Sequence, residues 1–254
     1  AFEFRQFEDD DNLSNVDRGI GIFSKLEAKR EGKNINFTLS GFGRVDKEDQ
    51  ERQVLSLEDL FLNYSFGAND NWHVDLGYKV FNWTSLEAFD PADIINSRNF
   101  DSDLENLEKF GELTLSFKGD FLFGNGELFY WPRLENPSFP HGKSRLGFGS
   151  DIQKGVFVDG DDTDRWGHQW GIKINQVFNS FDLSIFYVDH LDRQFPVIGN
   201  SSFIEDKTKL LCGAEFCPTD GTLNTPYYFR SKEYGGTLSF VYDSWIFKLE
   251  GVYR

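Results

Sequence analysis

Apolar and polar side chains alternate residue by residue through most of this chain, and this spacing predicts β-strands. Trp72, Val74 and Leu76, for example, alternate with His73 and Asp75. No stretch keeps apolar residues at helical spacing for more than about two turns. The pattern therefore predicts an all-β protein of about eleven strands, near residues 1–8, 19–30, 35–45, 57–67, 72–83, 111–123, 127–134, 165–178, 181–192, 232–242 and 245–254.

The connections between these segments alternate strictly between tight turns and long loops. The tight turns, rich in Gly, Asn, Asp and Ser, are predicted at Glu31–Asn34, Gly67–Asn71, Gly124–Gly126, Asn179–Ser180 and Asp243–Ser244. The long loops fall at about 9–18, 46–56, 84–110, 135–164 and 193–231. Outer-membrane barrels are built in this way, with short turns in the periplasm and long loops outside the cell.

Strand length favours the same architecture, because most of the predicted strands have about 9–13 residues, enough to cross a bilayer at a tilt. Strands of soluble sandwiches commonly have about five or six residues. We therefore predict one domain over 1–254, an antiparallel transmembrane up-and-down β-barrel with short periplasmic turns and long extracellular loops.

Aromatic residues make up 17% of the chain, and the largest of them gather beside the connections. Beside the tight turns lie Trp72, Phe178, Phe181 and Trp245, and beside the long loops lie Trp83, Trp131 and Trp166. This placement predicts two aromatic girdles, one at each membrane interface. The alternative explanation is that aromatic residues simply favour strands.

Composition narrows the possible partners and compartment. The formal net charge of −16 excludes nucleic acid as a partner, because phosphate binding needs a basic surface. No run of 18 apolar residues is present, which excludes helical membrane spans. Cys212 and Cys217 have neither redox nor zinc spacing, and we expect a local disulfide between them. No signal peptide is visible after Ala1, so we expect an exported protein whose signal peptide has already been removed.

Three segments resemble, in the same order, those of a family of Gram-negative outer-membrane proteins described as a large β-barrel of unknown function with porin-like members. They are Leu76–Trp83 with Asp90–Arg98, Trp170–Lys173 with Phe186–Pro196, and Tyr234–Ser239 with Leu249–Tyr253. The resemblance implies an outer-membrane location, with membrane lipid and lipopolysaccharide as partners. Members of that family are usually about twice as long. This length, and an odd strand number where such barrels have an even one, lead us to expect that 1–254 is the N-terminal part of a larger barrel. The alternative is a complete barrel of about ten or twelve strands.

The polar sides of the strands are expected to line a hydrated lumen with charges of both signs. The long segment 84–110 is predicted to be a constriction loop, with Arg98 beside Asp93 and Asp101 lining the pore, or else to cap the barrel from outside. Opposite charges that merely pair across strands are the alternative. The candidate pore-lining residues are Lys25, Glu27, Lys29, Arg44, Asp75, Lys79, Arg98, Glu112, Lys118, Lys173, Lys248 and Glu250.

Signals for chemistry are weak. The four histidines have no metal-ligand spacing, and neither a nucleophile elbow nor a phosphate-binding loop is present, so we expect no enzyme and no catalytic residue. Two acidic runs could bind Ca²⁺ in extracellular loops, although solvated loops are the favoured explanation. They are Asp9–Asn12 and the set Asp159, Asp161, Asp162 and Asp164. No other cofactor is expected.

Three functions remain in view. The first is an outer-membrane porin-like channel for small hydrophilic solutes that favours cations. The second is a structural or docking barrel that binds other envelope proteins through the 135–164 and 193–231 loops. The third is a secreted β-sandwich that binds carbohydrate through its aromatic residues. The resemblance by itself does not decide among them, because a fold does not fix a function.

Overall fold

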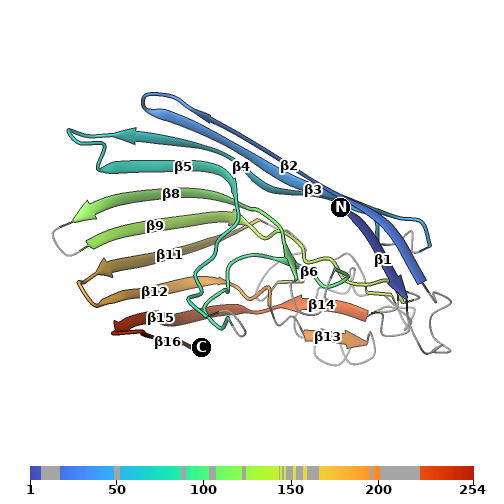
Figure 1. Cartoon of the computed structure of the whole chain (residues 1–254). Helices are drawn as coiled ribbons and strands as arrows, with labels where there is room; N and C mark the ends of the chain where they lie inside the picture. Colours follow the sequence, from blue (N-terminus) through green and yellow to red (C-terminus); the bar gives the residue numbers. More distant parts are fainter. Residues whose placement is uncertain are drawn as a thin grey trace.

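The computed structural model describes residues 1–6, 18–48, 52–86, 90–102, 107–121, 124–142, 144, 146, 151–152, 157–158, 166–194, 197–200 and 224–254. One eleven-stranded sheet dominates the chain, and its strands follow one another in sequence order (Figure 1). They are β1 (Phe2–Gln6), β2 (Arg18–Glu31), β3 (Ile35–Asp46), β4 (Val54–Phe66), β5 (Trp72–Lys79), β8 (Glu112–Phe121), β9 (Gly124–Arg133), β11 (Trp166–Val177), β12 (Phe181–Leu191), β15 (Arg230–Tyr242) and β16 (Trp245–Tyr253). Every pair of neighbours is antiparallel, which confirms the predicted all-β meander.

Two smaller sheets lie in the long connections. One pairs β6 (Arg98–Asn99) with β7 (Glu108–Lys109). The other contains β10 (Phe157–Val158), β13 (Val197–Asn200) and β14 (Asn224–Tyr228). In the described part of the chain, no helix is long and apolar enough to cross a membrane.

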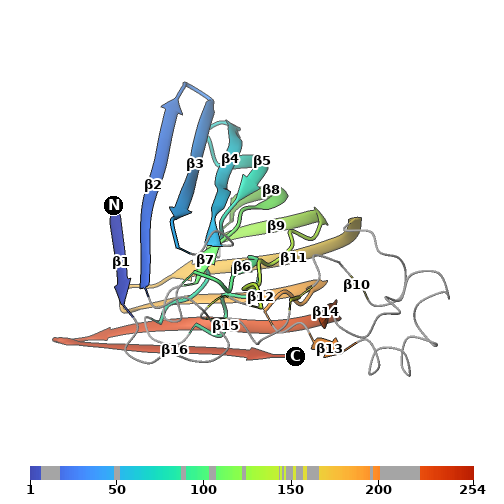
Figure 2. The ribbon, with the colours of Figure 1, turned by 90° about the vertical axis from the view of Figure 1, so that its right-hand side faces the viewer.

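The large sheet is curved and open. Figure 2 shows a trough, with β2 and β3 rising on one side and β15 and β16 forming the other. Among the described residues β1 pairs only with β2 and β16 only with β15, so these two strands are the edges. No hydrogen bonds join β1 to β16, so the sheet is not closed into a barrel, and the expectation that 1–254 is part of a larger barrel stays a prediction.

The two faces of the sheet have opposite polarity. On the outer, convex face Leu62, Leu76 and Leu249 are 48%, 57% and 68% exposed. On the inner, concave face Glu112 and Gln169 are fully buried. A soluble protein buries its apolar face and exposes its polar one, so this sheet has the reverse arrangement.

Aromatic rings gather at both ends of the outer face. Near the long connections, the rings of Trp170 and Tyr187 lie 5.0 Å apart and those of Tyr187 and Tyr234 lie 4.7 Å apart. Near the tight turns, the rings of Phe178 and Phe181 lie 4.3 Å apart, and Trp245 there is 67% exposed. Two aromatic belts therefore exist on the outer face, and tyrosine dominates the belt on the side of the long connections.

The structure corrects three details of the prediction. Trp83 and Trp131 are buried on the inner side of the sheet, so they belong to neither belt. Gly124–Gly126 is the beginning of β9 and pairs with β8, so these residues form part of a strand and not the expected turn. The strand expected over 72–83 ends at Lys79, because the chain there leaves the sheet and crosses its inner face.

One irregularity in the sheet matters for the site. Ser40 pairs with Asp59 and Gly41 pairs with Leu57, so Glu58 is an extra residue in β4 and forms a bulge. Gly111 donates its N–H to the carbonyl of Leu57 at 3.0 Å, and a Cβ at Gly111 would overlap the carbonyl oxygen of Glu58. The chain that re-enters the sheet at β8 therefore packs directly on this bulge.

Candidate functional site

The connection between β5 and β8, residues 80–111, lies against the inner face of the sheet and is called here the inner segment; its residues 87–89 and 103–106 are outside the described part (Figures 1 and 2). Ala92, Ile94, Ile95 and Ser97 in the inner segment are almost completely buried. The inner segment therefore lies inside the curve of the sheet, as a constriction loop would; its role as a constriction or as a cap at the end of the barrel stays a prediction.

Aromatic side chains fix one half of the inner segment to the wall. Phe81 packs edge-on against Phe129 at 5.5 Å between ring centroids, and Trp83 lies 5.3 Å from Phe129 and 5.1 Å from Phe186. Trp131 completes the cluster and is fully buried. The concave side in front of β9 and β12 is therefore filled with rings.

Two carboxylates of the sheet hold the backbone of the inner segment. Glu250 of β16 accepts hydrogen bonds from the N–H of Ser85 at 2.8 Å and the N–H of Ala92 at 2.6 Å. Glu112 of β8 accepts from the N–H of Ser97 at 3.0 Å. Both residues were expected to line the pore, and both lie on the inner face, but their carboxylates are engaged with the inner segment.

The turn of the inner segment is held by its own ion pairs. Asp93 is buried and receives Arg98 Nη2 at 2.8 Å and Lys109 Nζ at 2.5 Å. Burial raises the pKa of the Asp93 carboxyl, and the two cations oppose that change. The expected contact between Arg98 and Asp93 is present. Asp101 is buried and accepts from the hydroxyl of Ser144 at 2.9 Å.

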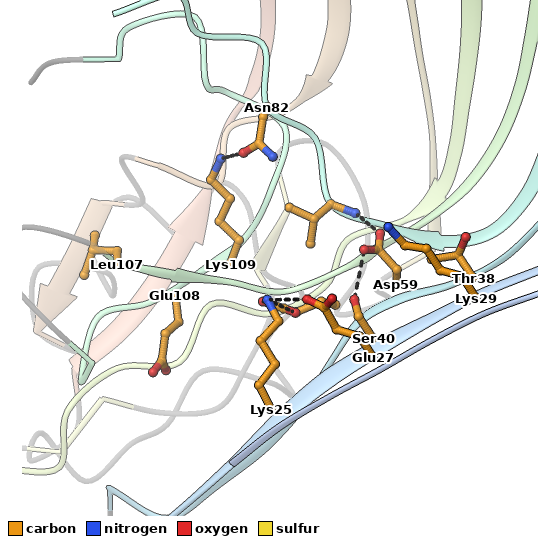
Figure 3. Close-up of a pocket in the computed structure, with 12 residues that line it drawn as sticks. Lys25, Glu27, Lys29, Thr38, Ser40, Asp59, Asn82, Leu107, Glu108 and Lys109 are labelled. Atoms are coloured by element: carbon orange, nitrogen blue, oxygen red, sulfur yellow. Dashed lines mark hydrogen bonds and ion pairs between the residues drawn. The ribbon is translucent and has the colours of Figure 1, made fainter. Parts of the chain in front are cut away.

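A polar cavity of about 390 Å³ remains between the inner segment and the wall formed by β2, β3 and β4 (Figure 3). Three lysines and four carboxylates face it. Its lining consists of Lys25, Glu27, Lys29, Thr38, Ser40, Glu58, Asp59, Val80, Asn82, Leu107, Glu108 and Lys109.

Several of these charges are already engaged by the protein. Lys109 reaches the side-chain oxygen of Asn82 at 2.6 Å in addition to Asp93. Glu108 forms an ion pair with Arg44, behind the cavity wall. Asp59 accepts hydrogen bonds from Ser40 and from the N–H of Val80, at 2.9 and 3.0 Å.

The other charges belong to the wall alone. Lys25 of β2 crosses β3 to meet Glu58 of β4 at 2.8 Å, and these two side chains are 42% and 19% exposed. Glu27 lies next along the same face, 3.5 Å from Lys25, and is 59% exposed. Lys29 follows at the next inward position of β2 and is also exposed.

The predicted pore-lining residues fall into distinct settings, all on the inner face except Arg98, which belongs to the inner segment. Lys25, Glu27 and Lys29 line the cavity. Asp75 and Lys79 pair with each other at 2.5 Å. Arg44 is buried against Glu108, and Lys173 lies 5.0 Å from the Trp83 ring. Glu112 and Glu250 hold the inner segment. Lys118 and Lys248 lie nearer the tight turns.

Sequence reasoning missed a second charged network, which ties distant strands together. Arg193 is fully buried, 3.0 Å from Glu112 and 3.3 Å from His190. His190 in turn lies 3.0 Å from Glu233 of β15, and Arg254 contacts the second oxygen of Glu233 at 3.2 Å. The alternation of β12 placed His190 inside, but nothing in the sequence identified its partners.

Other predicted sites fall outside the described residues. These are the acidic runs Asp9–Asn12 and Asp159, Asp161, Asp162 and Asp164, and the cysteines Cys212 and Cys217. Within the described ranges, no group of three or more His, Cys, Asp or Glu side chains is placed to hold a metal ion.

Comparisons with known proteins establish no family. No family model matches the chain, so the resemblance noted in the sequence is not confirmed in that way. A 72-residue stretch, 26% of the chain, is 32% identical to the redox-sensing transcriptional repressor Rex of Geobacillus kaustophilus. That stretch covers 34% of the repressor, so the chain spans about a third of the length of this curated relative.

A comparison with solved structures finds two outer-membrane proteins, both at low similarity. The OmpF porin of Salmonella typhi, solved with daunomycin, has a TM-score of 0.42 at 10% identity, over 92% of this chain and 56% of the porin. The copper transporter OprC has a TM-score of 0.33 at 9% identity, over 89% of this chain and 36% of the transporter. TM-scores below 0.5 do not establish a shared fold.

Proposed function

We propose that this chain forms wall and constriction of an outer-membrane channel that passes small hydrophilic solutes. The observation that carries the proposal is the reversed polarity of the sheet. Leu62, Leu76 and Leu249 face outward and are exposed, whereas Glu112 and Gln169 are buried inside. In lipid the outer leucines gain an apolar environment, at roughly 25 cal/mol for each Å² of apolar surface removed from water. In water they would remain exposed.

The two aromatic belts support the same orientation. Tyr187 and Phe181 mark the two belts on β12 and are six residues apart, about 20 Å along a strand at roughly 3.3 Å per residue. Trp245 and Tyr253 mark them on β16, eight residues or about 26 Å apart. Membrane barrels carry an apolar band of about 25 Å between their girdles. The tyrosine belt then faces the outer leaflet and its lipopolysaccharide, on the side of the long connections.

The solute path follows the cavity along β2, β3 and β4, because the aromatic cluster fills the opposite side. Lys25, Glu27 and Lys29 line one wall, and Glu108 and Lys109 of the inner segment face them. With three lysines and four carboxylates, the lining favours cations only slightly. The carbohydrate-binding sandwich has less support, since in the described residues no second sheet covers the outer leucines.

The test is electrical. The protein is extracted in detergent from outer membranes and added to a planar lipid bilayer in potassium chloride. Stepwise conductance increases are expected, with K⁺ slightly preferred over Cl⁻. Protein that inserts, as shown by co-flotation with lipid vesicles, but gives no conductance would overturn the channel proposal.

A further inference from the structure

The cavity offers a solute one pair of opposite charges that the rest of the protein does not use. Lys25 and Glu58 contact each other at 2.8 Å; the Lys25 side chain is 42% exposed, and the Glu58 side chain is 19% exposed. By contrast, Lys109 and Glu108 are bound to Asp93 and Arg44. An entering solute can therefore exchange partners with Lys25 and Glu58 without loosening the inner segment.

Lys25 is available to a solute because its side chain is 42% exposed, whereas Glu58 is only 19% exposed, so its carboxylate needs a positively charged partner whenever Lys25 moves away. The bulge in β4 adds to this availability, since Glu58 is the extra residue there and has no cross-strand partner on β3. The position of the Glu58 carboxylate is therefore set by the bulge and by the contact with Lys25.

The other lining groups restrict the chemistry of the solute. Among the lining residues of the described chain no aromatic ring is present, so a sugar would find no surface to stack on. Thr38, Ser40 and Asn82 offer hydrogen bonds, and only Val80 and Leu107 are apolar. The volume of about 390 Å³ is near the lower end of small-molecule pockets, which hold roughly 300–1,000 Å³. The solute is therefore small, polar and charged.

We propose that the cavity recognises small zwitterions of the α-amino-acid type, with the solute carboxylate at Lys25 and its ammonium group at Glu58. This inference rests on the proposed channel function and specifies its solute. A zwitterion replaces one ion pair by two, so neither protein charge loses its partner while the solute is bound. A simple cation at Glu58 leaves Lys25 with only its longer contact to Glu27 at 3.5 Å, and a simple anion at Lys25 leaves the Glu58 carboxylate without a positively charged partner.

The experiment compares three probes of similar size in the same bilayer. L-alanine carries both charges, propionate lacks the ammonium group, and ethylammonium lacks the carboxylate. Each is added to a conducting channel in potassium chloride, and the concentration that halves the K⁺ current is measured. We expect L-alanine to act at about fivefold lower concentration than either ion, the effect of one additional weak ion pair.

Variants locate the effect. Lys25→Gln and Glu58→Gln should each abolish the advantage of L-alanine, with Glu58→Gln leaving propionate the stronger blocker and Lys25→Gln leaving ethylammonium the stronger. The exchanged pair Lys25→Glu/Glu58→Lys should restore it, because the zwitterion binds in the reverse direction. Lys232→Gln, an exposed lysine of β15 away from the cavity, is the matched control and should behave like the parent protein.

The outcomes are separable. Absence of any conductance contradicts the channel itself. A conducting channel in which L-alanine blocks no better than ethylammonium or propionate overturns the zwitterion site and leaves the channel intact. An L-alanine advantage that survives in both Lys25→Gln and Glu58→Gln also overturns it, because the recognition then occurs elsewhere.

Discussion

Replacing Ile174 by arginine tests directly whether the outer face of the sheet lies in hydrocarbon. Ile174 is on strand β11, inside the sheet, faces outward and is 42% exposed. Trp170 of the outer belt and Phe178 beside the tight turn lie four residues away on either side, about 13 Å each at roughly 3.3 Å per residue. Ile174 therefore marks the middle of the apolar band.

The expected cost follows from this depth. Arginine on the lipid face of a membrane barrel costs about 2–4 kcal/mol at the midplane and about 0–1 kcal/mol near the interfaces. At about 1.4 kcal/mol for each tenfold change, Ile174→Arg should lower the folding equilibrium constant by about 30- to 700-fold. A half-exposed strand position in water would lose only about 0.2–1 kcal/mol through weaker cross-strand contacts.

The assay is reversible urea unfolding in lipid vesicles, followed by tryptophan fluorescence. With an m-value of about 2 kcal/mol/M, the midpoint should fall by about 1–2 M. Tyr242→Arg, at an exposed position beside the last tight turn, is the matched control and should shift the midpoint by less than about 0.5 M. Equal shifts for the two variants would refute the idea that the outer face is embedded in lipid.

Three further predictions concern the inner segment and its supports. Glu250→Gln should loosen the inner segment, because a neutral amide binds the N–H groups of Ser85 and Ala92 less strongly than a carboxylate does. Single-channel conductance and the rate of proteolysis of the inner segment should both rise, and no change in either would contradict this. Gly111→Ala should lower the free energy of unfolding by about 1–2 kcal/mol and the thermal midpoint by about 2–8 °C, because the new Cβ overlaps the Glu58 carbonyl. An unchanged thermal midpoint would argue against close packing of Gly111 on the bulge. Arg193→Met should lower the free energy of unfolding, measured in urea, by about 3–5 kcal/mol, because it leaves the Glu112 carboxylate buried without its cation. Arg193→Met/Glu112→Gln should recover part of this loss, and no recovery would mean that the loss does not come from the unpaired Glu112.

Strand order and facing were predictable from the sequence, because alternation with a period of two is a local property. The eleven expected segments correspond to the strands of the large sheet, and the inward residues were assigned to the correct side. The prediction of the aromatic girdles was wrong for two residues, because an aromatic residue beside a long connection can face either the lipid or the interior. Trp83 and Trp131 stand beside long connections, as girdle residues do, but packing with Phe129 draws both into the interior. Whether the sheet closes depends on its two edge strands, and the sequence addressed this only through the odd number of predicted strands.

One feature of the sequence could have identified some of the cavity residues that were not predicted. Glu58 and Asp59 are adjacent acidic residues in a strand that otherwise alternates, and such a doublet breaks the period of two. The bulge resolves the conflict by letting both side chains reach the inner side. The partners of Glu108 and Lys109 come from segments far away in sequence, and only the folded chain brings Arg44 and Asp93 to them.

The inner face contains charges with two different physical roles, which explains why its polarity alone does not identify a pore. Glu112, Arg193 and Glu233 are fully buried, and each meets an opposite charge or a backbone N–H. Such groups cannot exchange partners with a passing solute, because each unpaired buried charge would cost several kcal/mol. Lys25 and Glu27 lie on the same face but are 42% and 59% exposed, because neither the inner segment nor the aromatic cluster covers β2 there. Solute selectivity should therefore change with substitutions at the exposed charges, and substitutions at the buried ones should change stability.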